Sequence, residues 1–128
     1  MKLYELPCEL DKDIDRYEEL VQRFRRGDLS AAQLKAFRIP MGIYEQRDNE
    51  RYMMRIRLPG GFLTPSQLIF VADLAREYSD WPLHFTTRQD VQIHNLRLED
   101  TVVLLKKLRK VGLSSRGGGG NTVRNIAG

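Results

Sequence analysis

One short stretch of the sequence brings together an arginine, a glutamine and a histidine, as Arg88, Gln92 and His94. Val91 and Ile93 alternate with Gln92 and His94, and side chains on a strand point to opposite faces with a period of two. The alternation predicts a strand that buries its two β-branched residues and presents an amide and an imidazole on the other face, with the guanidinium at the preceding turn. Such groups bind anions, although an ordinary half-exposed strand has the same alternation.

A second stretch, residues 52–58, repeats this pattern with more charge. Met54, Ile56 and Leu58 share one face of the predicted strand, so Arg55 and Arg57 project together from the other face. If both strands lie in one sheet, its polar face carries Arg55, Arg57, Arg88, Gln92 and His94. Like charges on neighbouring strand positions repel each other, so either water or a bound polyanion must offset them.

The sequence gives little support for a catalytic triad, a metal site or a cysteine-based site. Its serines and threonines have no Asp–His partner at a recognisable spacing, so no catalytic triad is indicated. His84 and His94 are too few and too far apart to indicate a metal site, and His84 is expected to be a partly buried strand residue. The single cysteine, Cys8, can form neither an intrachain disulfide nor a zinc or iron–sulfur site by itself. A formal net charge of +4 favours anionic partners.

Two helices are predicted before the sheet. Over residues 9–26 the apolar side chains fall on one stripe with helical spacing, and Asp11 or Asp13 could cap the start. A short second helix is predicted to begin after Ser30 and to stop at Pro40. These helices form an arm that packs against the rest of the chain.

After the arm, hairpins and helices alternate. The predicted elements are hairpin, helix, hairpin and helix, at 43–58, 64–79, 83–96 and 99–111. Thr64, Pro65 and Gln67 form a capping box with proline in the first turn of the third predicted helix, and Leu68 is expected on its buried stripe.

This order predicts an α+β fold, an antiparallel sheet with two helices on one face, preceded by a helical N-terminal arm. We place the boundaries at 1–40 for the arm, 41–113 for the sheet and its two helices, and 114–128 for a glycine-rich tail. No apolar run approaches the roughly 20 residues of a membrane span. The N-terminus has no signal-peptide pattern, so a cytoplasmic location is expected.

Three motifs carry a resemblance to a known family: Met54–Gly61 (MRIRLPGG), Thr86–His94 (TTRQDVQIH) and Val123–Ile126 (VRNI). In this order and spacing they resemble the signatures of the sirohaem-containing nitrite and sulfite reductases, over roughly residues 38–128. The end of the arm, residues 24–28, resembles the nitrite reductases in particular.

The resemblance implies a ferredoxin-like half domain and, as cofactors, sirohaem joined to a 4Fe–4S cluster. It implies the six-electron reduction of nitrite to ammonia or of sulfite to sulfide, with an electron donor such as ferredoxin. By motif, Arg55 and Arg124 resemble the arginines that contact the substrate oxyanion. The residues that resemble the sirohaem-binding positions are Arg57, Thr87, Arg88, Gln92, His94 and Asn125.

The sequence also departs from the family. The cluster cysteines, the later lysines of the substrate pocket and the second half domain are absent, so residues 114–128 resemble the truncated start of the sirohaem and cluster domain. We therefore expect an N-terminal part of a longer reductase that is inactive alone. Its partners would be nitrite or sulfite and the missing C-terminal half, and the exposed pairing surface could form a homodimer.

Two alternatives remain open at this stage. One is a standalone tetrapyrrole-binding module that reduces nothing. The other is a small anion- or RNA-binding module. Four-stranded sheets that bind RNA use aromatic side chains to stack bases, and the predicted polar face lacks paired aromatics. We therefore expect neither a nucleic acid nor a membrane as partner.

Overall fold

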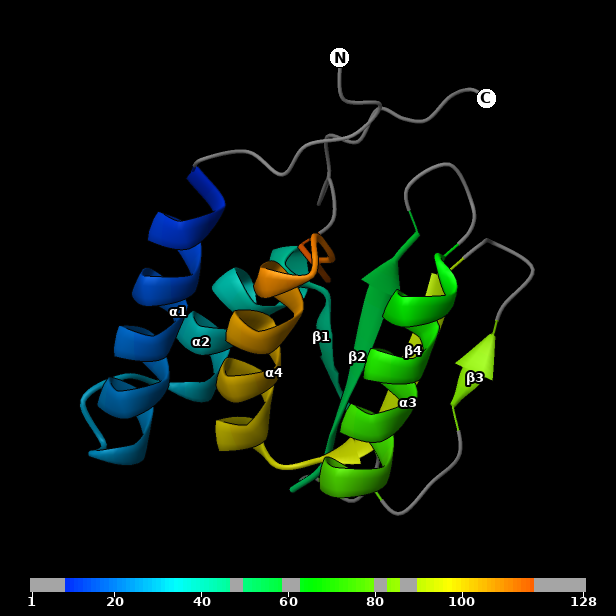
Figure 1. Cartoon of the computed structure of the whole chain (residues 1–128). Helices are drawn as coiled ribbons and strands as arrows, with labels where there is room; N and C mark the ends of the chain where they lie inside the picture. The colour runs from blue at the N-terminus through cyan, green and yellow to red at the C-terminus, as the bar shows by residue number, and fades with distance from the viewer. Residues whose placement is uncertain (1–8, 47–49, 59–62, 80–82, 86–89, 117–128) are drawn as a thin grey trace.

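A computed structural model of the chain describes residues 9–46, 50–58, 63–79, 83–85 and 90–116. Its elements, in chain order, are α1 (Glu9–Arg25), α2 (Ala31–Arg38), the 3₁₀ turn η1 (Ile39–Met41), β1 (Ile43–Glu45), β2 (Tyr52–Arg57), α3 (Pro65–Tyr78), β3 (His84–Phe85), β4 (Asp90–Leu96) and α4 (Leu98–Lys110). The predicted order of arm, hairpin, helix, hairpin and helix is confirmed, and so is the α+β class (Figure 1).

The four strands form one antiparallel sheet in the order β1-β2-β4-β3. Since β2 and β3 are both antiparallel to β4, they run parallel to each other and are joined through α3, which makes a split β-α-β unit. Helices α3 and α4 lie on the same side of the sheet (Figure 1). This is the ferredoxin-like arrangement expected from the sequence.

Local signals set the helix ends, with one error in our expectation. Ser30 and Thr64 cap α2 and α3 through reciprocal bonds with the glutamine three residues later, as predicted. Asp11 and Asp13 do not cap α1, because the helix already begins at Glu9 and both carboxylates lie within it. Among the described residues, no helix combines the length and the apolar composition needed to cross a membrane.

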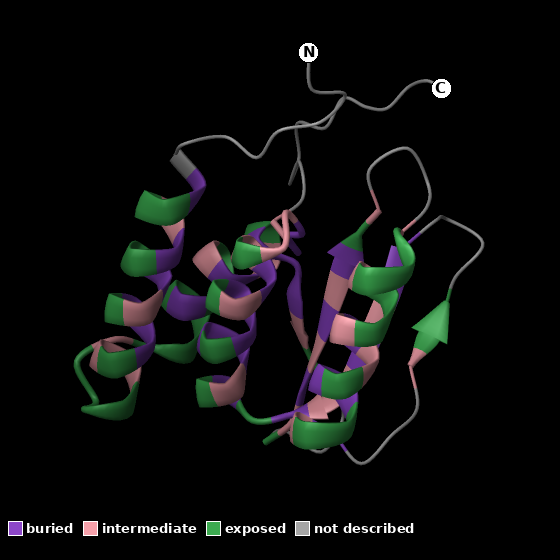
Figure 2. Cartoon of the chain, viewed as in Figure 1, coloured by how far each residue is buried: buried purple, intermediate pink, exposed green. Residues whose placement is uncertain are grey.

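The arm and the sheet share one hydrophobic core. Buried residues of α1 and α2 belong to the same cluster as those of β2, β4 and α4, and the buried faces of these helices point inward (Figure 2). On α3 the buried residues are Val71, Leu74 and Ala75, whereas Leu68 is 40% exposed. The expected burial of Leu68 is therefore wrong; the stripe of α3 is centred on Leu74, which the spacing argument left out.

A bulge interrupts β4. Tyr52 pairs with Leu96 and Met54 with Ile93, so two residues of β4 face one residue of β2. Asn95 adopts a left-handed conformation with φ of 62°, which asparagine tolerates better than most residues. Its N–H donates to the Gln46 side chain at 2.6 Å. Because of the bulge, Leu96 turns into the core while His94 stays on the opposite face.

Candidate functional site

The face of the sheet opposite α3 and α4 carries the polar side chains that the alternation predicted. We call it the polar face, and its described residues are Tyr44, Met53, Arg55, Arg57, His84, Asp90, Gln92 and His94. Directly paired residues of neighbouring strands project to the same side. Arg55 pairs with Gln92, and Gln92 pairs with His84, so a guanidinium, an amide and an imidazole form one row across three strands.

Residues from two of the family-like motifs meet the segment that precedes the third motif at one end of this face. Arg57 pairs with Asp90 across β2 and β4, and it also forms a β-bridge with Ser114. The chain after Arg57 enters the first motif's glycines, the chain before Asp90 holds the second motif, and the chain after Ser114 leads to the third. The fold therefore brings residues of the first two motifs next to Ser114, which precedes the third motif by nine positions, although these segments are far apart in sequence.

The attachment of the Ser114 segment is tight. The Arg57 N–H donates to the Ser114 carbonyl at 3.0 Å, and the Ser115 hydroxyl donates to the Met41 carbonyl at 2.6 Å. Gly42 lies against this segment with φ of +81°, and a Cβ there would stand 1.9 Å from the Ser115 carbonyl oxygen. Only glycine fits both the conformation and the space.

Four predicted site residues, Thr87, Arg88, Arg124 and Asn125, lie outside the described residues. Their assignment stays a prediction. The other four, Arg55, Arg57, Gln92 and His94, all lie on the polar face, as the alternation required.

Arg55 is held from two sides. Its Nε lies 3.5 Å from the Asp90 carboxylate, whose side chain is 7% exposed, and its guanidinium carbon lies 5.4 Å from the centre of the Tyr44 ring. The Nε atom is buried and has no hydrogen-bond partner among the described residues, and its 3.5 Å distance to the Asp90 carboxylate exceeds the usual length of such a bond. A buried donor without an acceptor is costly, so Arg55 retains unused hydrogen-bonding capacity.

Gln92, His94 and His84 form the other half of the face. His94 Nε2 lies 3.1 Å from Gln92 Oε1; an amide oxygen only accepts, so in this contact the imidazole donates. The His84 and His94 rings meet edge to face, 5.4 Å apart. Burial, and secondly the nearby His84, lower the pKa of His94 below 6.5. His94 is therefore a neutral donor at pH 7, and its bond occupies the oxygen of the Gln92 amide rather than the nitrogen.

The sequence pattern did not assign Tyr44, Asp90 or His84 to the polar face. Asp90 is in phase with Gln92 and His94, so the same alternation could have found it. Tyr44 needed the register of the first hairpin, in which it pairs with Met53. His84 is exposed rather than partly buried, so that expectation is wrong. The two histidines are close in space, but no group of three His, Cys, Asp or Glu side chains that could hold a metal occurs in the described part of the chain.

The donor set fits a ligand rich in carboxylates. Arg57 is exposed, the Gln92 amide carries two N–H donors, and Arg55 has a buried N–H without an acceptor among the described residues. Guanidinium and amide groups are the usual partners of carboxylates and other oxyanions. These side chains of the chain itself are therefore compatible with a tetrapyrrole bearing many carboxylates, and with a small oxyanion beside it.

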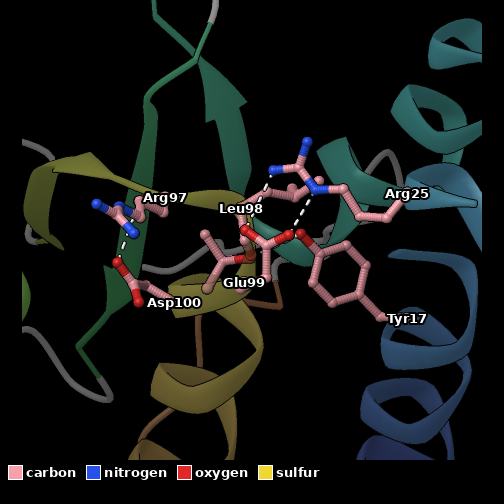
Figure 3. A network of polar contacts seen from close by, with 7 residues as sticks. Tyr17, Arg25, Arg97, Leu98, Glu99 and Asp100 are labelled. Atoms are coloured by element: carbon pink, nitrogen blue, oxygen red, sulfur yellow. Dashed lines mark hydrogen bonds and ion pairs between the residues drawn. The ribbon is translucent and has the colours of Figure 1, made fainter. Parts of the chain in front are cut away.

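A separate cavity of about 470 Å³ lies between the arm, β2 and the start of α4. None of the predicted site residues lines it. Arg38 at its wall is 4% exposed, donates to the Ile43 carbonyl at 2.9 Å and lies over the Tyr52 ring. Next to it, Arg25 of α1 reaches over Tyr17 to Glu99 of α4 (Figure 3). Arg25 and Glu99 thus pair with each other, and Arg38 is held by a backbone carbonyl and an aromatic ring.

Comparison with known proteins gives one family. The nitrite/sulfite reductase ferredoxin-like half domain matches residues 44–111. The match begins near the start of β1 and ends just after α4, so it covers the sheet with its two helices and leaves the arm outside.

Individual relatives are similar over more than half of the chain. The chain is 38% identical to an assimilatory ferredoxin-dependent nitrite reductase of Haloferax mediterranei over 99 residues, which is 68% of this chain and 17% of the relative. It is 43% identical to a ferredoxin–nitrite reductase of Synechococcus elongatus over 79 residues, 61% of this chain and 15% of the relative. A sulfite reductase (NADPH) hemoprotein beta-component of Pectobacterium carotovorum is 39% identical over 75 residues, 58% of this chain and 13% of the relative. The chain thus spans less than a fifth of the length of these relatives.

Proposed function

The chain belongs to the nitrite and sulfite reductase family through its ferredoxin-like half domain, and from this membership we propose that it forms part of the cofactor- and substrate-binding site of such a reductase. The reaction is the six-electron reduction of nitrite to ammonia or of sulfite to sulfide. The observation that carries the proposal is the meeting of Arg57, Asp90 and Ser114 at one end of the polar face, because Arg57 and Asp90 belong to the first two motifs and Ser114 precedes the third.

In this proposal the residues of the chain bind and orient. Arg55, with Arg124, binds the substrate oxyanion and offsets its negative charge by a fixed positive charge, which stabilises charge that develops during reduction. The side chains that hold the carboxylates of sirohaem are Arg57, Thr87, Arg88, Gln92, His94 and Asn125. Sirohaem, when bound, supplies electrons to the oxyanion.

The remaining parts of the site come from outside these residues. A 4Fe–4S cluster needs four cysteine thiolates, and this sequence has one cysteine. We assign residues 41–113 to the half domain and residues 114–128 to the start of the segment that leads to the rest of the cofactor site. Ferredoxin is the proposed electron donor, because relatives are named for their dependence on it.

The test is a titration of sirohaem into the 128-residue chain, followed by absorbance. We expect saturable binding that Gln92→Leu and Arg88→Ala each weaken about tenfold, the loss expected for one hydrogen bond to a carboxylate. Gln22→Leu is the matched control, since Gln22 is an exposed glutamine on α1.

The outcomes separate clearly. Equal affinity of the Gln92→Leu and Gln22→Leu proteins would remove the polar face from the cofactor site. Absence of saturable binding by the wild-type chain would show that these residues do not hold sirohaem by themselves.

A further inference from the structure

The ion pair of Arg55 and Asp90 differs from the other arginine–carboxylate pairs that link separate elements. Arg109–Asp11 and Arg116–Asp13 have contacts of 2.8 Å, and Arg25 binds Glu99 with two nitrogens. Arg55 Nε stands 3.5 Å from Asp90 and makes no hydrogen bond there. An arginine retained for stability alone is expected to form two parallel N–H···O hydrogen bonds with its carboxylate partner.

The loose pair is also the more buried one. The side chains of Arg55 and Asp90 are 26% and 7% exposed, whereas those of Arg25 and Glu99 are 51% and 55% exposed. Screening by water is weaker at a buried pair, so the Asp90 charge acts strongly on the Arg55 guanidinium even without a hydrogen bond. Any anion that Arg55 binds must come within a few ångströms of the same carboxylate.

We propose that Asp90 is an internal counter-anion for Arg55, which holds the guanidinium against Tyr44 in the ligand-free chain and lowers the affinity of the polar face for a small oxyanion. The inference rests on the proposed function, because it takes Arg55 as the oxyanion-binding residue. It assigns to Asp90 a positioning role that acts through Arg55.

Two features of the fold support this assignment. Asp90 is the direct cross-strand partner of Arg57, so one carboxylate faces both arginines of β2 and offsets one of their two charges. Tyr44 contacts the other side of the Arg55 guanidinium, and a cation over an aromatic ring loses little when it turns toward a stronger partner. The buried Nε then gains the acceptor that it lacks.

The test is a titration of the 128-residue chain with sulfite and with nitrite at constant ionic strength, with chloride as the blank. Binding is read from the ¹⁵N–¹H signal of the Arg55 Nε, identified by its absence in Arg55→Lys. We expect Asp90→Asn to raise oxyanion affinity about three- to tenfold, as expected for the removal of one charge near a partly hydrated anion. Asparagine keeps the size of the side chain and removes its charge, and the Tm of each variant is measured to show that it is folded.

Asp73→Asn is the matched control. Asp73 is an exposed aspartate on α3 that pairs with Arg76 at 3.2 Å, and its change should leave the affinity at the wild-type value. If the Arg55 Nε signal of the wild-type chain shifts saturably with the oxyanions, but Asp90→Asn binds them equally or more weakly, the counter-anion role is wrong and the oxyanion role of Arg55 stands. If neither the wild-type chain nor the Asp90→Asn protein shows an oxyanion-specific shift, the counter-anion role of Asp90 and the oxyanion role of Arg55 are both wrong.

Discussion

Two regions of the molecule differ in whether their buried polar side chains are fully hydrogen-bonded. Between α1 and α4, the Tyr17 hydroxyl donates to Thr101 Oγ1 at 2.8 Å, and Thr101 in turn donates to the Leu98 carbonyl. On the polar face, Arg55 keeps a buried donor without an acceptor in the described part of the chain. The first region satisfies its polar groups internally, whereas the second leaves capacity for something that the chain does not supply.

At the interface between the arm and α4, the polar groups serve the fold. Four ion pairs also join the arm to α4 and the segment after it: Arg25–Glu99, Lys106–Glu18, Arg109–Asp11 and Arg116–Asp13. These pairs are largely exposed, and such pairs contribute little each. The buried Tyr17 is therefore expected to stabilise this interface more than any one of the ion pairs does.

Tyr17→Ala should have the largest effect on stability. The side chain is fully buried, so its loss removes apolar contacts and leaves a cavity, at a cost of about 3–5 kcal/mol in the free energy of unfolding. Tyr17→Phe removes only the hydroxyl and should cost about 1 kcal/mol. Chemical denaturation measures both; equal losses would mean that the hydrogen bond, rather than packing, holds the arm.

Removing the four acidic partners together should have an intermediate effect. The variant Asp11→Asn, Asp13→Asn, Glu18→Gln and Glu99→Gln should lose no more than about 2 kcal/mol at low salt. High salt should abolish the difference from wild type, because it screens exposed pairs. A loss that persists at high salt would contradict this and show that the pairs act by packing.

One member of this set also gives a pH dependence. The hydrogen bond from Arg25 lowers the pKa of Glu99 below its ordinary value of 4.5. The stabilisation is therefore present above pH 4.5 and is lost as pH falls through the lowered pKa. Comparing Glu99→Gln with wild type across this range isolates the contribution.

Much of the fold could be predicted because its signals are local. The capping boxes at Ser30 and Thr64 and the alternation in β4 each depend on a few neighbouring residues. Leu68 was misplaced because the helical stripe alone does not say where its centre faces; the contact of α3 with the sheet decides that. The bulge at Asn95 left only a weak sign, a break in alternation before Leu96.

The candidate site was predicted in composition rather than in geometry. The period of two placed Arg55, Arg57, Gln92 and His94 on one face, because that depends only on strand geometry. The contacts of Arg55 with Asp90 and Tyr44 depend on the register of two strand pairs, which a single sequence does not specify. For the same reason the proximity of His84 and His94 was missed.

On the polar face, Arg55→Met combined with Asp90→Asn should change stability by less than about 1 kcal/mol in either direction. Replacing a buried ion pair by groups of similar volume is often neutral or stabilising, and here the pair leaves a donor unsatisfied. A loss of stability as large as that of Tyr17→Ala would show that the Arg55–Asp90 pair serves the fold as much as the α1–α4 interface does. Denaturation measures the effect.

The smallest expected effect concerns the two histidines of the polar face. The pKa of His94 lies below 6.5, with burial as the larger cause and His84 as the smaller. His84→Ala should therefore raise this pKa only part of the way to 6.5, as measured by NMR titration of the imidazole protons. A full return to 6.5 would make His84 the main cause.

Because the folded chain prefers the neutral ring of His94, stability should fall as pH drops below 6.5 until the lowered pKa is passed, and His94→Gln should remove this dependence. In the comparison of the two regions, this result identifies His94 at pH 7 as a neutral hydrogen-bond donor, which leaves the arginines as the positive charges of the polar face.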